Sequence, residues 1–298
     1  MGKRTKKIAV ITGATSGIGE LAAIELAKQG IQLVLTARSE ERAEATLRRI
    51  REVSPEAEVK VYYGNLSVLK EVQRMGEEIS KDHPVINILI NNAGLHAFEQ
   101  RITAEGYPEM IAVNYFAPWC LTQQLKSSLQ ASGQARVINV ASEASRNYGK
   151  FKLPGDLTDT TPFSARGSSA IYGKTKLYNI MFTKELARRW AGTGIEAFAL
   201  NPGFNVTGLG RELRFAALLE KILKFLRLGD PRYGAEIIVR LATAAEYKGH
   251  SGGYYNVKTG TELVPVSLAD DPFMQKKLWE ETEKLLKNQV GSDLSLQV

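Results

Sequence analysis

The sequence contains little of what disulfide-stapled or membrane-spanning proteins depend on. Only one of its 298 residues, Cys120, is a cysteine, so no disulfide can form within the chain and we expect a reducing compartment. No apolar run approaches the roughly 18 residues that span a bilayer. The basic first residues lead into a short strand-like run, not into the apolar stretch of a signal peptide. We therefore expect a soluble, cytoplasmic protein.

Histidine is almost as scarce as cysteine. His83, His96 and His250 are far apart in the sequence and have no partner at ligand spacing, so we predict no metal site. Each histidine is expected at a surface or loop position. Cys120 follows Trp119 in an apolar stretch and is interpreted as a small buried hydrophobe.

Positive charge exceeds negative charge without being concentrated in one region. The net charge is +7, from 39 Lys and Arg against 32 Asp and Glu, and the one dense cluster is Lys3, Arg4, Lys6 and Lys7. We interpret this cluster as a solvated tail, because no nucleic-acid-binding motif accompanies it. No nucleic-acid partner is predicted.

Short apolar, β-branched runs alternate with helical stretches along the chain. Strands are predicted at residues 7–12, 31–37, 59–63, 86–91, 136–141, 195–200 and 253–257. The first two helices are predicted at residues 17–30 and 40–53. Because the strands are almost wholly apolar, helices should cover both faces of the sheet. The pattern predicts one domain over residues 1–298: a doubly wound α/β fold of Rossmann type, with a parallel sheet of about seven strands in three αβα layers.

Two segments are additional to this plan. Residues 143–171 are rich in Gly, Ser, Thr and Pro and are predicted to be an irregular insertion. Residues 204–230 are predicted to be a substrate lid, and within them 211–228 form an amphipathic helix. We favour the lid because the segment follows a motif at a strand end. A helix packed on the core and a helix in contact with a membrane surface are the alternatives.

A glycine-rich turn joins the first strand to the first helix. Glycines allow a tight turn that brings bare backbone close to a pyrophosphate, and the helix N-terminus supplies free N–H groups and partial positive charge. The position of the turn, between a first strand and a first helix, indicates a dinucleotide site. The residues assigned to it are Gly13, Thr15, Ser16, Gly17, Ile18 and Gly19.

The end of the second predicted strand indicates which dinucleotide binds. An NAD site has a carboxylate there for the ribose 2′-hydroxyl, whereas this sequence has Arg38 followed by Ser39. A guanidinium cannot accept a hydrogen bond, but it suits a 2′-phosphate. The sequence therefore predicts NADP(H), with Arg38 and Ser39 in the site.

Tyr172 and Lys176 are spaced by four residues, so they share one face of a predicted helix that begins near them. Free tyrosine, with a pKa of about 10, is a poor acid–base catalyst at neutral pH. Lowering that pKa by roughly 3 units requires about 4 kcal/mol. One cation about 5 Å away contributes on the order of 3 kcal/mol at an effective dielectric near 20. Lys176 and the positive nicotinamide together therefore suffice.

Further polar residues end the predicted strands, at the edge where doubly wound folds bind ligands. Ser142 follows the fifth strand, and Asn114 lies in the helix after the fourth. The strand-end motifs assigned to cofactor binding are Asn91-Asn92-Ala93-Gly94 and, after Asn201, Pro202-Gly203.

Together these motifs resemble the short-chain dehydrogenase/reductase family in its classical form, over roughly residues 7–260. The resemblance implies that Tyr172 is the general acid–base and that Ser142 binds the substrate carbonyl. It also implies that Lys176 binds the nicotinamide ribose and lowers the tyrosine pKa, and that Asn114 holds a relay water. Thr207 matches the residue that steadies the nicotinamide carboxamide.

The sequence departs from the family pattern at three points. Asn65 stands where the family usually has Asp before the adenine-packing Leu66, and Asn205 stands at a nicotinamide contact where Val is usual. The interval of 30 residues between Ser142 and Tyr172 is longer than usual. That insertion is similar to the retinol-dehydrogenase-like branch, including the oxidoreductase part of the WW-domain oxidoreductase.

This likeness implies a bulky apolar substrate, such as a retinoid, steroid or polyketide. Homodimers or homotetramers are common in the family. The sequence thus predicts an NADPH-dependent oxidoreductase that interconverts a carbonyl and an alcohol. The alternatives are a carbon–carbon double-bond reductase and a cofactor-binding regulator with little turnover.

Overall fold

The computed structural model describes residues 6–203 and 230–290, and within them one sheet of seven parallel strands. Each strand begins and ends within two residues of its predicted bounds. The strands are β1 (Ile8–Thr12), β2 (Gln32–Ala37), β3 (Val59–Tyr63), β4 (Ile88–Asn91), β5 (Ala135–Val140), β6 (Ile195–Asn201) and β7 (Tyr254–Asn256). Their order, β3-β2-β1-β4-β5-β6-β7, confirms the predicted doubly wound fold.

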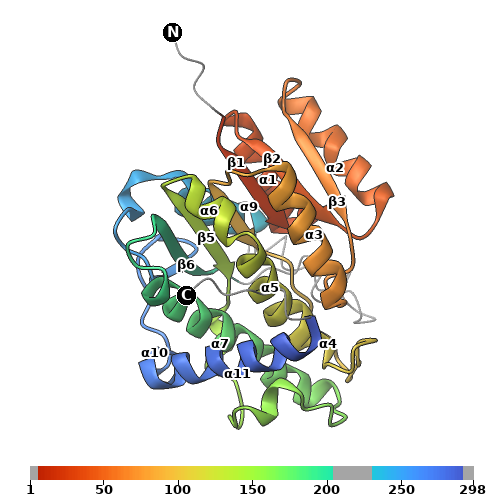
Figure 1. The fold of residues 1–298 in the computed structure, drawn as a ribbon, viewed down its shortest axis with the longest axis vertical. Helices are drawn as coiled ribbons and strands as arrows, with labels where there is room; N and C mark the ends of the chain where they lie inside the picture. The colour runs from red at the N-terminus through yellow and green to blue at the C-terminus, as the bar shows by residue number, and fades with distance from the viewer. Residues whose placement is uncertain (1–5, 204–229, 291–298) are drawn as a thin grey trace.

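Helices cover both faces of this sheet. Alternate strand residues face opposite sides, so Ala9 and Ile11 pack under one helical layer and Val10 under the other. The first layer contains α1 (Gly17–Lys28), α2 (Glu40–Val53) and α9 (Pro231–Thr243). The second contains α3 (Leu69–Asp82), α5 (Ala117–Gln124), α7 (Ala165–Arg189) and α11 (Pro272–Val290). In Figure 1, the dark-blue α11 runs alongside the green α7.

Shorter helices complete the described chain. They are α4 (Glu109–Ile111), the π-helix η1 (Ala112–Phe116), α6 (Lys126–Ala131), the 3₁₀ helices η2 (Glu143–Arg146), η3 (Gly155–Leu157) and η4 (Ala245–Tyr247), and α10 (Ser267–Asp270). The strand order reverses between β1 and β4: the strands after β1 are added on one side of it, and the strands after β4 are added on the other side. That switch point opens a crevice at the carboxyl ends of the strands.

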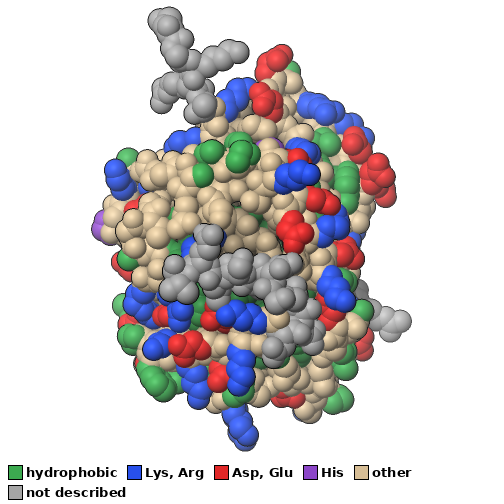
Figure 2. Space-filling model, in the orientation of Figure 1, with side chains coloured by type: hydrophobic (Ala, Val, Ile, Leu, Met, Phe, Trp, Pro, Cys, Tyr) green, Lys and Arg blue, Asp and Glu red, His purple; other side chains and the backbone are tan. Residues whose placement is uncertain are grey.

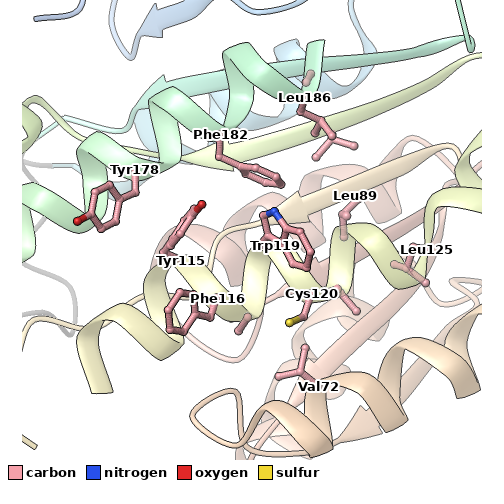
Figure 3. Close-up of a cluster of buried hydrophobic side chains, with 14 of the residues drawn as sticks. Val72, Leu89, Tyr115, Phe116, Trp119, Cys120, Leu125, Tyr178, Phe182 and Leu186 are labelled. Carbon is pink, nitrogen blue, oxygen red and sulfur yellow. The ribbon is translucent and has the colours of Figure 1, made fainter. Parts of the chain in front are cut away.

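Aromatic side chains fill the layer between α5, α7 and α11. Figure 3 shows Tyr115 of η1 and Trp119 of α5 on one side and Phe182 of α7 facing them from the other. Trp279 of α11 stacks on Phe182 at 5.7 Å between ring centroids and meets Trp119 edge-on at 5.8 Å. Cys120 is buried in this cluster, which confirms the prediction of a small buried hydrophobe.

Residues 143–171 are more regular than the sequence predicted. They contain η2 and η3, and α7 begins within them, so Tyr172 lies well inside α7 instead of at its start. The segment is anchored to the core by Leu157, which is fully buried, and by an ion pair of 2.8 Å between Asp156 and Lys174. The two charged side chains are only 11% and 9% exposed. The composition rich in Gly, Ser and Pro gave no indication that Leu157 and Asp156 would be buried.

Residues 204–229 of the predicted lid lie outside the described residues, and with them the helix predicted at 211–228. Asp230 caps α9 by accepting a hydrogen bond from the Arg232 N–H at 2.9 Å. Within residues 6–203 and 230–290, no helix is both long and apolar enough to cross a membrane. On the face drawn in Figure 2, Lys and Arg side chains are interspersed with Asp and Glu.

Candidate active site

A cleft of about 1060 Å³ lies at the carboxyl ends of the strands, and it brings together most of the predicted site residues. Those that line it are Gly13, Thr15, Ser16, Gly17, Ile18, Gly19, Arg38, Ser39, Asn65, Leu66, Asn92, Ala93, Gly94, Ser142, Tyr172, Lys176, Pro202 and Gly203. Asn205 and Thr207 lie outside the described residues. The cleft therefore unites the glycine turn with the Tyr172–Lys176 pair.

The glycine turn packs directly against the motif after β4. Gly13 has φ +66°, and a Cβ on it would lie 2.8 Å from the Cα of Ala93. A Cβ on Gly19 would lie 2.3 Å from the Asn92 amide nitrogen. That amide donates to the Thr12 and Gly13 carbonyls at 3.0 and 3.1 Å. No side chain fits at either glycine, so bare backbone lines the crevice where a pyrophosphate can approach.

Arg38 stands at the end of β2 with its side chain exposed on the rim of the cleft. Ser39 caps α2: its hydroxyl accepts from the Arg42 N–H at 3.4 Å. Arg42 also lines the cleft. Among the described residues no carboxylate forms an ion pair with either guanidinium, although Glu41 lies on the same rim. Two cations are thus available to a phosphate at this end.

Asn65 and Leu66 line the cleft beyond β3. The Asn65 side-chain oxygen accepts from the Ser67 N–H at 3.1 Å, and its backbone N–H donates to Glu71 at 2.7 Å. The asparagine is therefore held by the turn that leads into α3. A carbonyl oxygen has a second lone pair, so this bond leaves Asn65 able to accept from an adenine amine.

Lys176 is buried, with 3% of its surface exposed, and its ammonium donates to the Val140 carbonyl at 2.8 Å. Its nitrogen lies 5.5 Å from the centre of the Tyr172 ring, so the four-residue spacing does bring the two groups together. Burial lowers the pKa of Lys176 to about 8.

Burial also raises the pKa of Tyr172 above its ordinary value, because a phenolate loses hydration in the protein interior. The sequence argument counted the attraction of Lys176 and of the positive nicotinamide, and it predicted a lowered pKa for Tyr172. Desolvation sets the direction of the Tyr172 shift, and desolvation also lowers the pKa of the Lys176 ammonium. The phenol is therefore protonated at neutral pH, which is the form that a general acid requires.

Ser142 follows β5 with an extended backbone and begins η2. Its hydroxyl oxygen accepts from the Ala144 N–H at 3.1 Å, so the hydroxyl hydrogen can be donated into the cleft. Asn201 ties the neighbouring strand end to this turn, since its side-chain oxygen accepts from the Glu143 N–H at 3.4 Å. Ser142 and Tyr172 consequently line the same wall.

Two predicted residues lie behind this wall. Asn114 is fully buried in the π-helix η1, where its amide accepts from the Leu95 N–H at 2.8 Å and donates to the Thr175 hydroxyl at 3.0 Å. Asn91 does not line the cleft, in contrast to its assignment to cofactor binding. Its amide donates to Asn139 at 2.8 Å inside the core, because strand residues alternate between faces. Both residues support the wall from the inside.

Several lining residues were not predicted from the sequence, among them Arg42, His96, Phe98 and Glu143. Arg42 could have been found, since it lies in the first turn of the helix that begins just after Arg38. His96 was expected at the surface or in a loop; it lies in a loop, but half-buried against Tyr172. His83 is buried and packs edge-on to a tyrosine ring, whereas His250 is exposed as expected. Within the part of the chain that the structure describes, no cluster of ligand-type side chains could hold a metal ion.

Comparisons with known proteins agree with this geometry. Residues 7–153 match the family model described as short chain dehydrogenase. Retinol dehydrogenase 14 of Homo sapiens is 31% identical over 296 residues, covering 94% of this chain and 86% of that protein.

Solved structures are similar over most of the chain. A Mycobacterium paratuberculosis protein is 27% identical with a TM-score of 0.74, covering 94% of this chain and 93% of its own. A Beutenbergia cavernae protein described as an NAD(P)-dependent gluconate 5-dehydrogenase, with NADP bound, is 26% identical with a TM-score of 0.64, covering 84% and 94%.

The sequence identity extends over nearly the whole chain. The sheet order, the glycine turn and the Tyr172–Lys176 pair lie inside the region that these relatives share. The chain therefore belongs to the short-chain dehydrogenase/reductase family of oxidoreductases, in its retinol-dehydrogenase-like branch.

Proposed function

We propose that this protein is an NADP(H)-dependent oxidoreductase that interconverts a carbonyl and an alcohol on a bulky apolar substrate. The observation that carries the proposal is the shared cleft, which holds a glycine turn and two guanidinium groups at one end and Tyr172, Lys176 and Ser142 at the other. The relative named retinol dehydrogenase 14 supports an alcohol substrate that is largely hydrocarbon.

The residues present fit a phosphorylated dinucleotide. The backbone near Gly13 and Gly19 leaves no room for a side chain, as close approach by a pyrophosphate requires. Arg38 and Arg42 line the end of the cleft beyond β2, where an NAD site would carry a carboxylate, and their guanidinium groups suit a 2′-phosphate. When bound, the cofactor would supply a hydride to the carbonyl carbon.

The chain's own groups would manage the proton and the oxygen. Ser142 can donate a hydrogen bond to the carbonyl oxygen, and the protonated phenol of Tyr172 can then give that oxygen a proton. Lys176, anchored on the Val140 carbonyl, stabilises the phenolate that remains. Asn114 holds the Leu95 backbone and the Thr175 hydroxyl behind this group, which fixes the wall.

The wall near Tyr172 is apolar enough to favour a large hydrocarbon substrate. Leu95, Phe98 and Val113 line this part of the cleft. Burying hydrocarbon against such side chains contributes roughly 25 cal/mol per Å² of apolar surface. Substrates with a long apolar body should therefore be bound more tightly than short carbonyl compounds.

The activity is tested by following NADPH oxidation with a panel of aldehydes and ketones that extends from acetaldehyde to decanal and all-trans-retinal. We expect turnover to increase with apolar size, and Tyr172→Phe to reduce kcat by at least 1000-fold, since the phenylalanine has no proton to give. Tyr148→Phe is the matched control, because Tyr148 does not line the cleft. A Tyr172→Phe variant with full turnover would remove the phenol from the mechanism. Product analysis distinguishes an alcohol from a reduced double bond.

Cofactor choice is tested separately. Arg38→Asp should raise the KM for NADPH by about 100-fold and lower that for NADH, because a carboxylate repels phosphate but accepts from a ribose hydroxyl. Glu41→Gln, on the same rim, is the control and should change neither KM by more than twofold. If wild type uses NADH as well as NADPH, the NADP(H) proposal is wrong.

A further inference from the structure

The imidazole of His96 lies flat against the ring of Tyr172. The two ring centroids are 4.7 Å apart and the planes differ by 16°, so the rings are stacked. His96 comes two residues after the Asn-Asn-Ala-Gly motif and lines the same cleft as the phenol. Phe98 packs on the imidazole in turn, at 4.8 Å between centroids.

A hydrogen bond to Ser168 of α7 fixes the orientation of this imidazole. The Nε2 atom of His96 lies 3.1 Å from the hydroxyl oxygen of Ser168, which is fully buried. The Ser168 hydroxyl donates its only hydrogen to the Ala165 carbonyl at 2.8 Å. In the bond between His96 and Ser168 the ring nitrogen is therefore the donor. Ser168 and Tyr172 are four residues apart and share one face of α7. One ring thus spans two successive turns of this helix.

Apart from the stacked His96 imidazole and the Lys176 ammonium, whose nitrogen lies 5.5 Å from the ring centre, no polar group of the described chain is recorded in contact with the Tyr172 side chain. Among residues 6–203 and 230–290, its hydroxyl makes no hydrogen bond, and the Lys176 ammonium is bonded to the Val140 carbonyl. The direction in which the phenol points therefore depends on what packs against its face. His96 supplies a flat, anchored surface at that face.

We infer that His96 is a positioning residue, which holds the Tyr172 ring in the plane from which its hydroxyl reaches the substrate oxygen. The inference rests on the proposed role of Tyr172 as the proton donor. It explains why a histidine, whose ring can stack and donate at the same time, occupies a site that a purely apolar side chain could fill. An unheld ring misplaces the hydroxyl, and displacements of this kind slow proton transfer.

Two substitutions separate the functions of the imidazole. His96→Gln keeps a donor for Ser168 but removes the ring, and His96→Phe keeps the ring but removes the donor. With NADPH and all-trans-retinal, or decanal where retinal is not turned over, we expect His96→Gln to lower kcat by about ten-fold. The KM for NADPH, and its Kd measured by fluorescence, should stay within twofold. His96→Phe should recover at least half of the wild-type kcat.

The hydrogen isotope effect gives a second measurement. With NADPH deuterated at the transferred position, the effect on kcat should increase in His96→Gln, because the chemical step becomes slower. A residue with a merely structural role would lower the thermal midpoint and weaken cofactor binding without rescue by phenylalanine. His250→Gln, at an exposed position, is the control and should be unchanged.

The possible failures are distinguishable. If Tyr172→Phe is inactive but His96→Gln keeps kcat within twofold of wild type, the positioning role is wrong and the proposed function stands. Equal losses in His96→Gln and His96→Phe also contradict it, because an aromatic ring at this position would then fail to restore kcat. If Tyr172→Phe keeps full turnover, the proposed function and the inference fail together.

Discussion

At Gly173 the helix α7 lies directly against the turn that Ser142 begins. A Cβ added to Gly173 would lie 2.2 Å from the Asn147 carbonyl oxygen and 2.4 Å from that of Ala144. Both oxygens belong to backbone at η2, which cannot turn away as a flexible side chain can. Gly173→Ala must therefore push η2 and α7 apart by about 1 Å to reach an ordinary contact distance.

This displacement would separate the two groups that act on the substrate oxygen. Ser142 begins η2 and Tyr172 adjoins Gly173 in α7, so the gap between their hydroxyls widens with the gap between these elements. A misplacement of about 1 Å costs on the order of 100-fold in rate. Overpacking of a close contact costs about 1–3 kcal/mol of folding free energy. We expect Gly173→Ala to show both this loss of rate and this loss of stability.

The assay measures kcat/KM with NADPH and a fixed apolar aldehyde, together with urea unfolding of the same preparation. Gly167→Ala is the matched control, since this glycine lies in the first turn of α7 and its added Cβ would meet only the Phe163 Cβ, at 3.3 Å. It should keep full activity and gain up to about 1 kcal/mol from helix propensity. A Gly173→Ala variant within threefold of wild-type activity would refute the proposed coupling of the two elements.

Three further predictions concern stability. Asp156→Asn leaves the buried Lys174 ammonium without its partner and should cost about 3–5 kcal/mol in urea unfolding; replacing both residues by apolar ones should recover most of this loss. Lys176 has a folded-state pKa of about 8, below its ordinary value of 10.5, so between these values the folded protein binds fewer protons than the unfolded chain. The destabilisation that comes from burying the Lys176 ammonium therefore falls as the pH rises from 8 toward 10.5. Wild type should therefore gain about 2 kcal/mol relative to Lys176→Met between pH 7 and 9.5, and a constant difference would contradict the shift. Trp279→Ala removes the ring stacked on Phe182 and should cost about 3–5 kcal/mol; a loss below 1 kcal/mol would mean that α11 is not firmly docked.

The fold could be predicted because its signals are local. Runs such as Ile8–Thr12 are apolar except for the final threonine, and the glycine turn after them gives a strand, a turn and a helix in sequence. The anchors of residues 143–171 could not be predicted. Asp156 and Lys174 form a buried ion pair only because η3 folds back onto α7, and an isolated charge in a polar segment is normally solvated.

The site was predictable in its membership and less so in its electrostatics. The spacing of Tyr172 and Lys176 indicates that they share a helix face, but it contains no information on how deeply both are buried, and burial decides the direction of their pKa shifts. His96 was missed for a similar reason. A single histidine in a loop has no periodicity, so its stacking on Tyr172 emerges only when the strand ends converge.

The docking of α11 determines where another copy of the chain could attach. Its Leu278 and Thr282 are fully buried, and Thr282 shares a hydrogen bond of 2.8 Å with the Tyr115 hydroxyl. Because α11 packs on α5 and α7, it already covers the aromatic side chains of these two helices within the same molecule. Self-association on this side must then use the outer surface of α11, where Lys276 and Glu280 are exposed, and such a charged contact should weaken as salt is added.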